Sequence, residues 1–223
     1  MTRPTFRVSG FILAALATVV QSAGALQLTP PPTWKWVTDR PARQVSTPDK
    51  VPDSAFTFVR MPPGWHITMG PGGVLFDPRY FVEEQFALES EVFHFPNSSN
   101  GEYGLFVGGA EMEGSGPRYV SFVIRGDGSA AAWERRSGET RMLSEWRRAE
   151  AVIPTDGKEI VRNQIRLVVT KKEAILRANG LDVLILPREA IPLDGQFGFR
   201  VGQGVNLHIT TLDATHRLAP TRP

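Results

Sequence analysis

The chain contains no cysteine. This absence excludes a disulfide framework, a cysteine nucleophile, a zinc–thiolate site and a lipid-modified N-terminal cysteine. The sequence also lacks the G-x-S-x-G motif of serine hydrolases and the H-E-x-x-H motif of zinc proteases. A chain without disulfide bonds depends on its hydrophobic core for stability, and 223 residues are enough to form one sizeable domain.

No long hydrophobic run is present either. The longest, Phe11 to Val20, has ten residues, whereas a membrane-spanning helix needs roughly 20. Arg3 and Arg7 precede this run, and the small residues Ala23-Gly24-Ala25 follow it. This order predicts a secretory signal peptide over residues 1–25, and therefore a secreted or periplasmic protein, with a bacterial source fitting best. After cleavage we expect no membrane span.

The net charge of the chain is also small. The sequence has 25 basic and 23 acidic residues, and Arg3 and Arg7 are the only charged residues before Leu26. Removing the signal peptide therefore leaves 23 residues of each sign. A neutral chain has no overall field to attract nucleic acid, so we expect no nucleic-acid partner.

A glycine-rich stretch, GEYGLFVGG over residues 101–109, lacks the features of a phosphate-binding loop. Ala110 and Glu111 follow it where a P-loop needs Lys and Ser or Thr. Read as a strand, the stretch places Gly104, Phe106 and Gly108 on one face, so glycines flank a single aromatic side chain. Glycine inside a strand often marks a close approach. We therefore expect this face of the strand, where glycines leave space around one aromatic ring, to lie under a second sheet or to form the floor of an open sugar-binding groove.

What is present is a succession of short alternating segments. Their apolar residues recur at every second position, as on strands with one buried face; examples are YVSFVIR, NQIRLVVT, FGFRV and VNLHITTL. The dipeptide Asn179-Gly180 is a strong signal for a tight hairpin. We count ten to twelve strands and no internal repeat, which predicts an all-β sandwich or barrel. Glu139 to Ala151 is the exception, for which we expect one short helix.

Residues 26–53 form a proline-rich N-terminal lead before a β-domain at 54–218 and a C-terminal tail at 219–223. Trp34 and Trp36 alternate with Lys35 in this lead, as on one face of a strand. Two interpretations remain open. The pair belongs to an edge strand docked on the domain, or it is an exposed anchor for a protein partner.

The chain resembles the concanavalin A-like lectin/glucanase superfamily, especially laminin-G-like modules and domains similar to 3-keto-disaccharide hydrolases. The resemblance spans roughly residues 55–215 and rests on four segments: GEYGLFVGG, YVSFVIRGDGSAAAWERRSG, NQIRLVVTKKEAILRANGLDV and GQFGFRVGQGVNLHITTLDA. It implies an antiparallel two-sheet jelly-roll sandwich with a concave face that often binds sugars.

The segment ESEVFH, residues 89–94, is the strongest candidate for chemistry. Strand alternation places Glu89 and Glu91 on one face, and retaining glycosidases use two carboxyl groups roughly 5 Å apart. The segment is similar to the E-x-D-x-x-E strand of β-glucanases in the superfamily. It departs from that strand at Glu91, which replaces an Asp, and at His94, which stands where the acid/base Glu belongs and falls on the opposite face. A solvated outer face is the simpler interpretation of the two glutamates.

The remaining candidates concern ligand binding. Trp65 and Trp133 could stack on sugar rings, with Phe106, Gly104, Gly108 and His94 as further ligand contacts; core packing is the alternative for each tryptophan. Asp77, Asn97 and Asp127 lie near predicted turns, but their spacing does not form a calcium loop, so we expect no metal site. The leading expectation is a non-catalytic module that recognises a carbohydrate or cell-surface glycan. A glycoside hydrolase using Glu89 and Glu91, and a module that binds a protein partner, are the alternatives.

Overall fold

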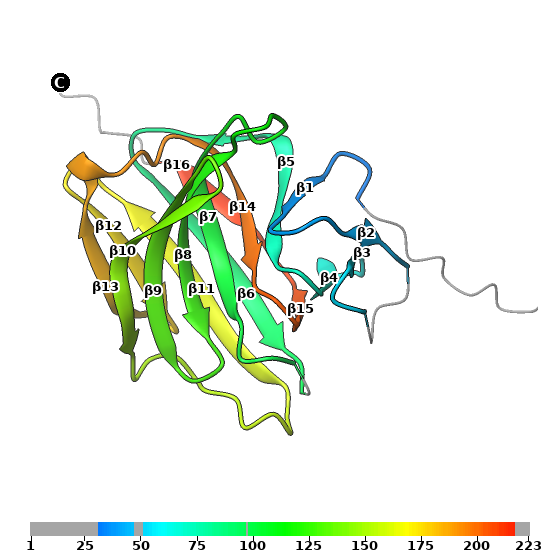
Figure 1. The fold of residues 1–223 in the computed structure, drawn as a ribbon. Helices are drawn as coiled ribbons and strands as arrows, with labels where there is room; N and C mark the ends of the chain where they lie inside the picture. The colour runs from blue at the N-terminus through cyan, green and yellow to red at the C-terminus, as the bar shows by residue number, and fades with distance from the viewer. Residues whose placement is uncertain (1–30, 47–50, 97, 217–223) are drawn as a thin grey trace, which may run out of the picture.

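The computed structural model describes residues 31–46, 51–96 and 98–216. Within these ranges the chain forms sixteen strands and one 3₁₀ turn, η1 (Arg188–Ala190). The strands build two sheets that pack face to face (Figure 1). The predicted signal peptide and the C-terminal tail lie outside the described residues. No helix of the described residues could cross a membrane.

Seven strands form the first sheet, which we call sheet A. In spatial order they are β1 (Lys35–Thr38), β5 (Gly73–Val82), β14 (Gly195–Val201), β7 (Glu102–Ala110), β8 (Arg118–Arg125), β9 (Ser129–Arg136) and β10 (Glu139–Arg148). All neighbouring strands of sheet A run antiparallel.

The second sheet, sheet B, has nine strands. In order they are β13 (Leu181–Pro187), β12 (Glu173–Ala178), β11 (Val161–Val169), β6 (Phe86–His94), β15 (Val205–Ile209), β4 (Trp65–Met69), β3 (Ala55–Arg60) and β2 (Arg43–Gln44), with β16 (Asp213–His216) also paired to β6. β15 and β16 pair with successive parts of β6. The β2–β3 pair is parallel and the others are antiparallel.

The main core lies between the two sheets, and the alternation read from the sequence predicts its members correctly. Each strand sends every second side chain inward, because successive residues of a strand point to opposite faces. The inward residues include Phe122 on β8, Leu167 on β11 and Phe199 on β14, all fully buried. The predicted hairpin is also confirmed: Asn179 and Gly180 both have positive φ, at 50° and 89°, as a type I′ turn requires.

Of the two tryptophans of the N-terminal lead, Trp34 precedes β1, the edge strand of sheet A, and Trp36 lies within it. β1 pairs with β5, so the docked-strand interpretation is the one that the structure shows. Trp34, 5% exposed, packs in the main core, with its ring stacked 5.5 Å from that of Phe199. Trp36 is 38% exposed and makes an edge contact with Phe56. The described part of the lead is therefore built into the sandwich.

The helix expected over Glu139 to Ala151 is wrong. Residues Glu139–Arg148 form β10, the edge strand of sheet A. Two register shifts, between Met142 and Ser144 and between Ser144 and Arg147, interrupt its pairing with β9. These bulges break the two-residue period that would have marked the segment as a strand.

Candidate functional site

The glycine-flanked Phe106 lies on the outer face of sheet A, the face turned away from sheet B. It belongs to a second apolar cluster, which we call the outer cluster, made of Val74, Phe76, Phe106, Met112, Tyr119, Val123 and Trp133. Phe106 is fully buried, and its ring contacts those of Phe76 and Tyr119. Both expected placements are therefore wrong, because Phe106 lies neither under sheet B nor at the floor of an open groove. Neighbouring aromatic rings cover it instead.

An ionic layer adjoins the outer cluster. Arg200 donates two hydrogen bonds to Asp39, at 2.9 and 2.6 Å, and two to Glu102, at 3.3 and 3.0 Å. Burial alone would lower the pKa of the Arg200 guanidinium, but these two carboxylates raise it above its usual value. Arg135 also pairs with Asp39. Arg200 points away from the main core, and it is nevertheless buried.

Trp133, a predicted sugar-stacking residue, lies under this layer. It is 3% exposed, and the guanidinium of Arg200 sits 4.9 Å from its ring centroid. Trp65 on β4 is half-buried, and its ring lies 5.3 Å from that of Trp34 and 5.5 Å from that of Phe199. The two tryptophans are thus separated onto different sheets and both pack against other side chains of the protein.

The predicted ligand-contacting glycines allow close approaches within the protein. A Cβ atom at Gly104 would lie 2.3 Å from the carbonyl oxygen of Phe122 on β8. Gly108 has a positive φ of 66°, and a Cβ there would lie 2.0 Å from the carbonyl oxygen of Pro192. Gly108 therefore lets the connection between β13 and β14 pass directly over β7.

Glu89 and Glu91 share the outer face of β6 in sheet B, as strand alternation predicts. Glu89 accepts hydrogen bonds from Gln164 and Arg166, at 2.5 and 3.0 Å. Glu91 accepts them from Thr210 at 2.8 Å and from Arg162 at 2.5 Å, and these two contacts hold the pKa of Glu91 below its usual value. A glycosidase acid needs the opposite shift, a raised pKa, to carry its proton at neutral pH.

His94 points into the sandwich from the opposite face of β6. It is 1% exposed, its ring stacks 5.3 Å from that of Tyr103, and neither ring nitrogen has a well-formed hydrogen bond among the described residues. Burial lowers the pKa of His94 because the charged imidazolium is poorly solvated there. His94 and the two glutamates therefore do not meet at one site.

The residues considered for calcium are engaged elsewhere. Asp77 is buried and accepts hydrogen bonds from Arg79 and Thr33, and Arg79 is the main reason that the pKa of Asp77 is lowered. Asp127 accepts bonds from the backbone and hydroxyl of Ser129 within its turn. Asn97 lies outside the described residues. No group of three or more potential metal ligands occurs in the described ranges.

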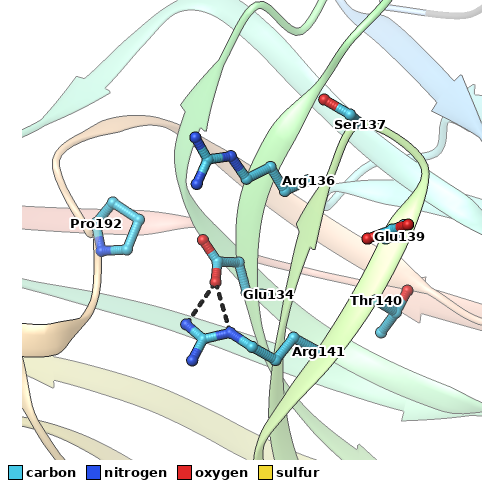
Figure 2. A pocket seen from close by; sticks show the side chains of 7 residues that line it. All are labelled: Glu134, Arg136, Ser137, Glu139, Thr140, Arg141 and Pro192. Carbon is cyan, nitrogen blue, oxygen red and sulfur yellow. Dashed lines mark hydrogen bonds and ion pairs between the residues drawn. The ribbon is translucent and has the colours of Figure 1, made fainter.

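A hollow that the sequence did not indicate lies at one end of the sandwich. We call it the end cleft (Figure 2). It has a volume of about 770 Å³ and separates the β9–β10 hairpin from the connection that leads from β13 to β14. Its lining is mostly polar or charged: Glu134, Arg136, Ser137, Glu139, Thr140, Arg141 and Pro192.

A smaller recess of about 310 Å³ continues the end cleft toward β7 and β8. It shares Glu134, Arg136 and Pro192 with the cleft and adds Gly108, Ala110, Arg118, Tyr119 and Asp194. The close approach at Gly108 therefore helps to set the wall of this site, because it places Pro192 against β7.

Glu134 and Arg141 form an ion pair in the lining of the end cleft. The guanidinium of Arg141 donates two hydrogen bonds, at 3.1 and 2.7 Å, to the same oxygen, Oε2 of Glu134. The other oxygen, Oε1, has no hydrogen bond among the described residues. The Glu134 side chain is 14% exposed, so this oxygen is held on a shielded, fixed carboxylate. Such an arrangement is suited to accept a hydrogen bond from a ligand hydroxyl.

The sequence contained little that could have revealed this site. Its residues come from a hairpin at 134–141 and a connection around Pro192, which lie some fifty positions apart. The helix expected over Glu139 to Ala151 concealed β10, which lines the cleft. Only the fold places the two segments opposite each other.

Comparisons with known proteins bear on the fold. No protein-family model matches the sequence, and no curated protein matches it. Among solved structures, the carbohydrate-binding module CBM66 from Bacillus subtilis has a TM-score of 0.59 at 10% identity, over 81% of this chain and 95% of the module. The chain has an all-β, two-sheet jelly-roll fold similar to that of this module.

Two other solved structures are less similar. A protein of unknown function with a galectin-like fold, also from Bacillus subtilis, has a TM-score of 0.49 at 14% identity, over 68% of this chain and 82% of its own. The alginate lyase A1-II′, of polysaccharide lyase family 7, has a TM-score of 0.48 at 14% identity, over 71% and 82%. At 14% identity and TM-scores below 0.5, neither structure indicates the activity of this chain.

Proposed function

We propose that the protein is a secreted or periplasmic, non-catalytic module that recognises a carbohydrate, and that the glycan binds in the end cleft. The observation that carries this proposal is the polar lining of the cleft, with the shielded carboxylate of Glu134 fixed by Arg141. The fold similarity to a carbohydrate-binding module supports the same conclusion.

The chemistry of the lining fits a polyhydroxylated ligand. Sugar hydroxyls both donate and accept hydrogen bonds, so a sugar site needs acceptors and donors side by side. Oε1 of Glu134 supplies an acceptor, Arg136 supplies donors, and the hydroxyl of Thr140 can do either. The volume of about 770 Å³ falls within the range of ordinary ligand sites.

A glycan array followed by titration calorimetry tests the proposal. For the tightest array ligand, we expect Glu134→Gln to weaken binding about tenfold or more, because a hydrogen bond to a charged group contributes about 1.5–3 kcal/mol. Glu89→Gln is the matched control, since Glu89 is a partly exposed, ion-paired glutamate on the outer face of sheet B. It should bind like the wild type.

Three outcomes would contradict the proposal in different ways. If only Glu89→Gln weakens binding, the ligand lies on sheet B. If incubation with the array ligand releases new reducing ends, and Glu89→Gln or Glu91→Gln abolishes this, the protein is a hydrolase. If a broad array contains no ligand at all, recognition of a protein partner replaces recognition of a glycan.

The proposed location is tested separately. Expression of the full chain in a bacterial host should yield a periplasmic or secreted product whose N-terminus has lost about 25 residues, as the signal-peptide pattern predicts. A cytoplasmic product with residues 1–25 intact would overturn this part of the proposal.

A further inference from the structure

The carboxylates around the end cleft are, with one exception, already neutralised by arginines. Glu134 pairs with Arg141 at 2.7 Å. In the recess, Arg118 pairs with Glu111 at 3.2 Å. On the β13–β14 connection, a further pair is formed at 2.7 Å by Arg188 and Asp194.

Arg136 is the arginine of the end cleft that has no carboxylate partner among the described residues. It makes no ion pair or side-chain hydrogen bond among the described residues, although it lines both the end cleft and the recess. Figure 2 shows its side chain extending from β9 toward Pro192. Arg118 adds a second unused donor in the recess, because its Nε is buried without a hydrogen-bond partner.

Glu139 is the one carboxylate of the lining without an ion pair. It stands opposite Arg136 in the β9–β10 register, but the two side chains do not come within ion-pair distance of each other. The cleft therefore offers two kinds of unused group: guanidinium donors and carboxylate acceptors, on Glu134 and Glu139. A neutral sugar would satisfy the acceptors with its hydroxyls, but it would leave the guanidinium of Arg136 without a charged partner.

We infer that the end cleft recognises an acidic glycan, in which the carboxylate of a hexuronic acid residue binds Arg136 while neighbouring hydroxyls bind the glutamates. This inference rests on the proposed function. A planar guanidinium matches a carboxylate through two parallel hydrogen bonds, and such charge-assisted bonds are about twice as strong as neutral ones.

The test uses pairs of oligosaccharides that differ only in charge. Each uronic acid trisaccharide of a panel is compared with its methyl ester, which has the same ring stereochemistry but no charge, by titration calorimetry against the full chain. We expect at least one acid to bind about tenfold or more tightly than its ester, and this preference to weaken as salt is raised. In Arg136→Gln the preference should disappear.

Two further variants separate charge, geometry and folding. Arg136→Lys keeps the positive charge but cannot bind bidentately, so it should retain only part of the preference. Arg147→Gln is the matched control: Arg147 is an exposed arginine on the same strand pair, outside the end cleft. Its preference should equal that of the wild type, and thermal melts should show that all variants fold.

The outcomes distinguish this inference from the proposed function. Neutral glycans that bind while no acid is preferred over its ester would overturn the inference alone, and so would a preference that survives in Arg136→Gln. A sulfated trisaccharide that binds as tightly as the acids would replace carboxylate recognition with general anion recognition. Failure of every glycan, acidic or neutral, would overturn both.

Discussion

Replacing Gly108 by alanine is a direct test of how the wall of the end cleft is built. Gly108 has a φ of 66°, and an added Cβ would lie 2.0 Å from the carbonyl oxygen of Pro192. Ordinary van der Waals contact begins at 3.4 Å, and Leu193 backs Pro192 on the core side with 1% exposure. The connection or β7 must therefore shift, and Pro192 lines the cleft.

The expected cost has two parts. A left-handed backbone conformation costs a non-glycine residue about 1–2 kcal/mol. The steric overlap adds about 1–3 kcal/mol, which is typical for inserting a methyl group where there is no space. We therefore expect Gly108→Ala to lower the free energy of unfolding by about 2–5 kcal/mol, and to weaken glycan binding because Pro192 lines the cleft.

Gly180 provides the matched control, because it isolates the backbone part of this cost. Its φ is 89°, and an added Cβ would find no atom within 4 Å. Gly180→Ala should therefore lose only about 1–2 kcal/mol. Urea denaturation followed by tryptophan fluorescence measures both variants. If Gly108→Ala were no less stable than Gly180→Ala, the close approach of the connection to β7 would be wrong.

Four other variants test the packing of the sandwich. Burial holds the pKa of His94 below its usual 6.5. The neutral ring therefore contributes to the stability of the fold above pH 6.5, and this contribution is lost as the pH falls. Urea midpoints measured from pH 7.5 to 5 should fall less for His94→Phe than for the wild type. Asn163 donates one hydrogen bond to the hydroxyl of Tyr103 and one to the carbonyl of Ile153, and accepts one from the Ile153 amide. Asn163→Ala should therefore cost about 2–4 kcal/mol in urea denaturation, and a loss below about 1 kcal/mol would contradict this role. Trp34→Ala should lower the free energy of unfolding by about 3–5 kcal/mol, as for a buried aromatic residue, and Trp36→Ala by less than about 1 kcal/mol. Equal losses in the two variants would contradict the docking of Trp34.

The sequence predicted the strands because most of them bury one face. A half-buried strand must alternate apolar and polar residues, and β11 and β15 do so over most of their length. The Asn179-Gly180 turn was equally readable, since few dipeptides adopt positive φ at both positions.

β10 could not be read in this way. It is an edge strand whose two bulges shift the pairing, so its apolar side chains do not recur at every second position. Because a helix was expected there, nothing in the sequence indicated that this segment lines the end cleft. A hollow made by two segments far apart in sequence depends on the packing of both.

The prediction for the outer face of sheet A was wrong for a different reason. Alternation shows that Phe106 and Arg200 leave the main core, but it does not show what covers them. Asp39, 161 positions from Arg200, supplies the carboxylate that allows this arginine to be buried. Long-range ion pairs of this kind leave no local pattern in the sequence.

The most direct test of the account is to locate the bound glycan by NMR. Backbone amide shifts of the isotope-labelled protein would be followed during titration with the tightest ligand from the glycan array. The account predicts the largest shifts over residues 134–141 and at Leu193, beside Pro192, with those of Glu89 and Glu91 unchanged. Shifts concentrated on β6 and β11 instead, with the end cleft silent, would contradict it.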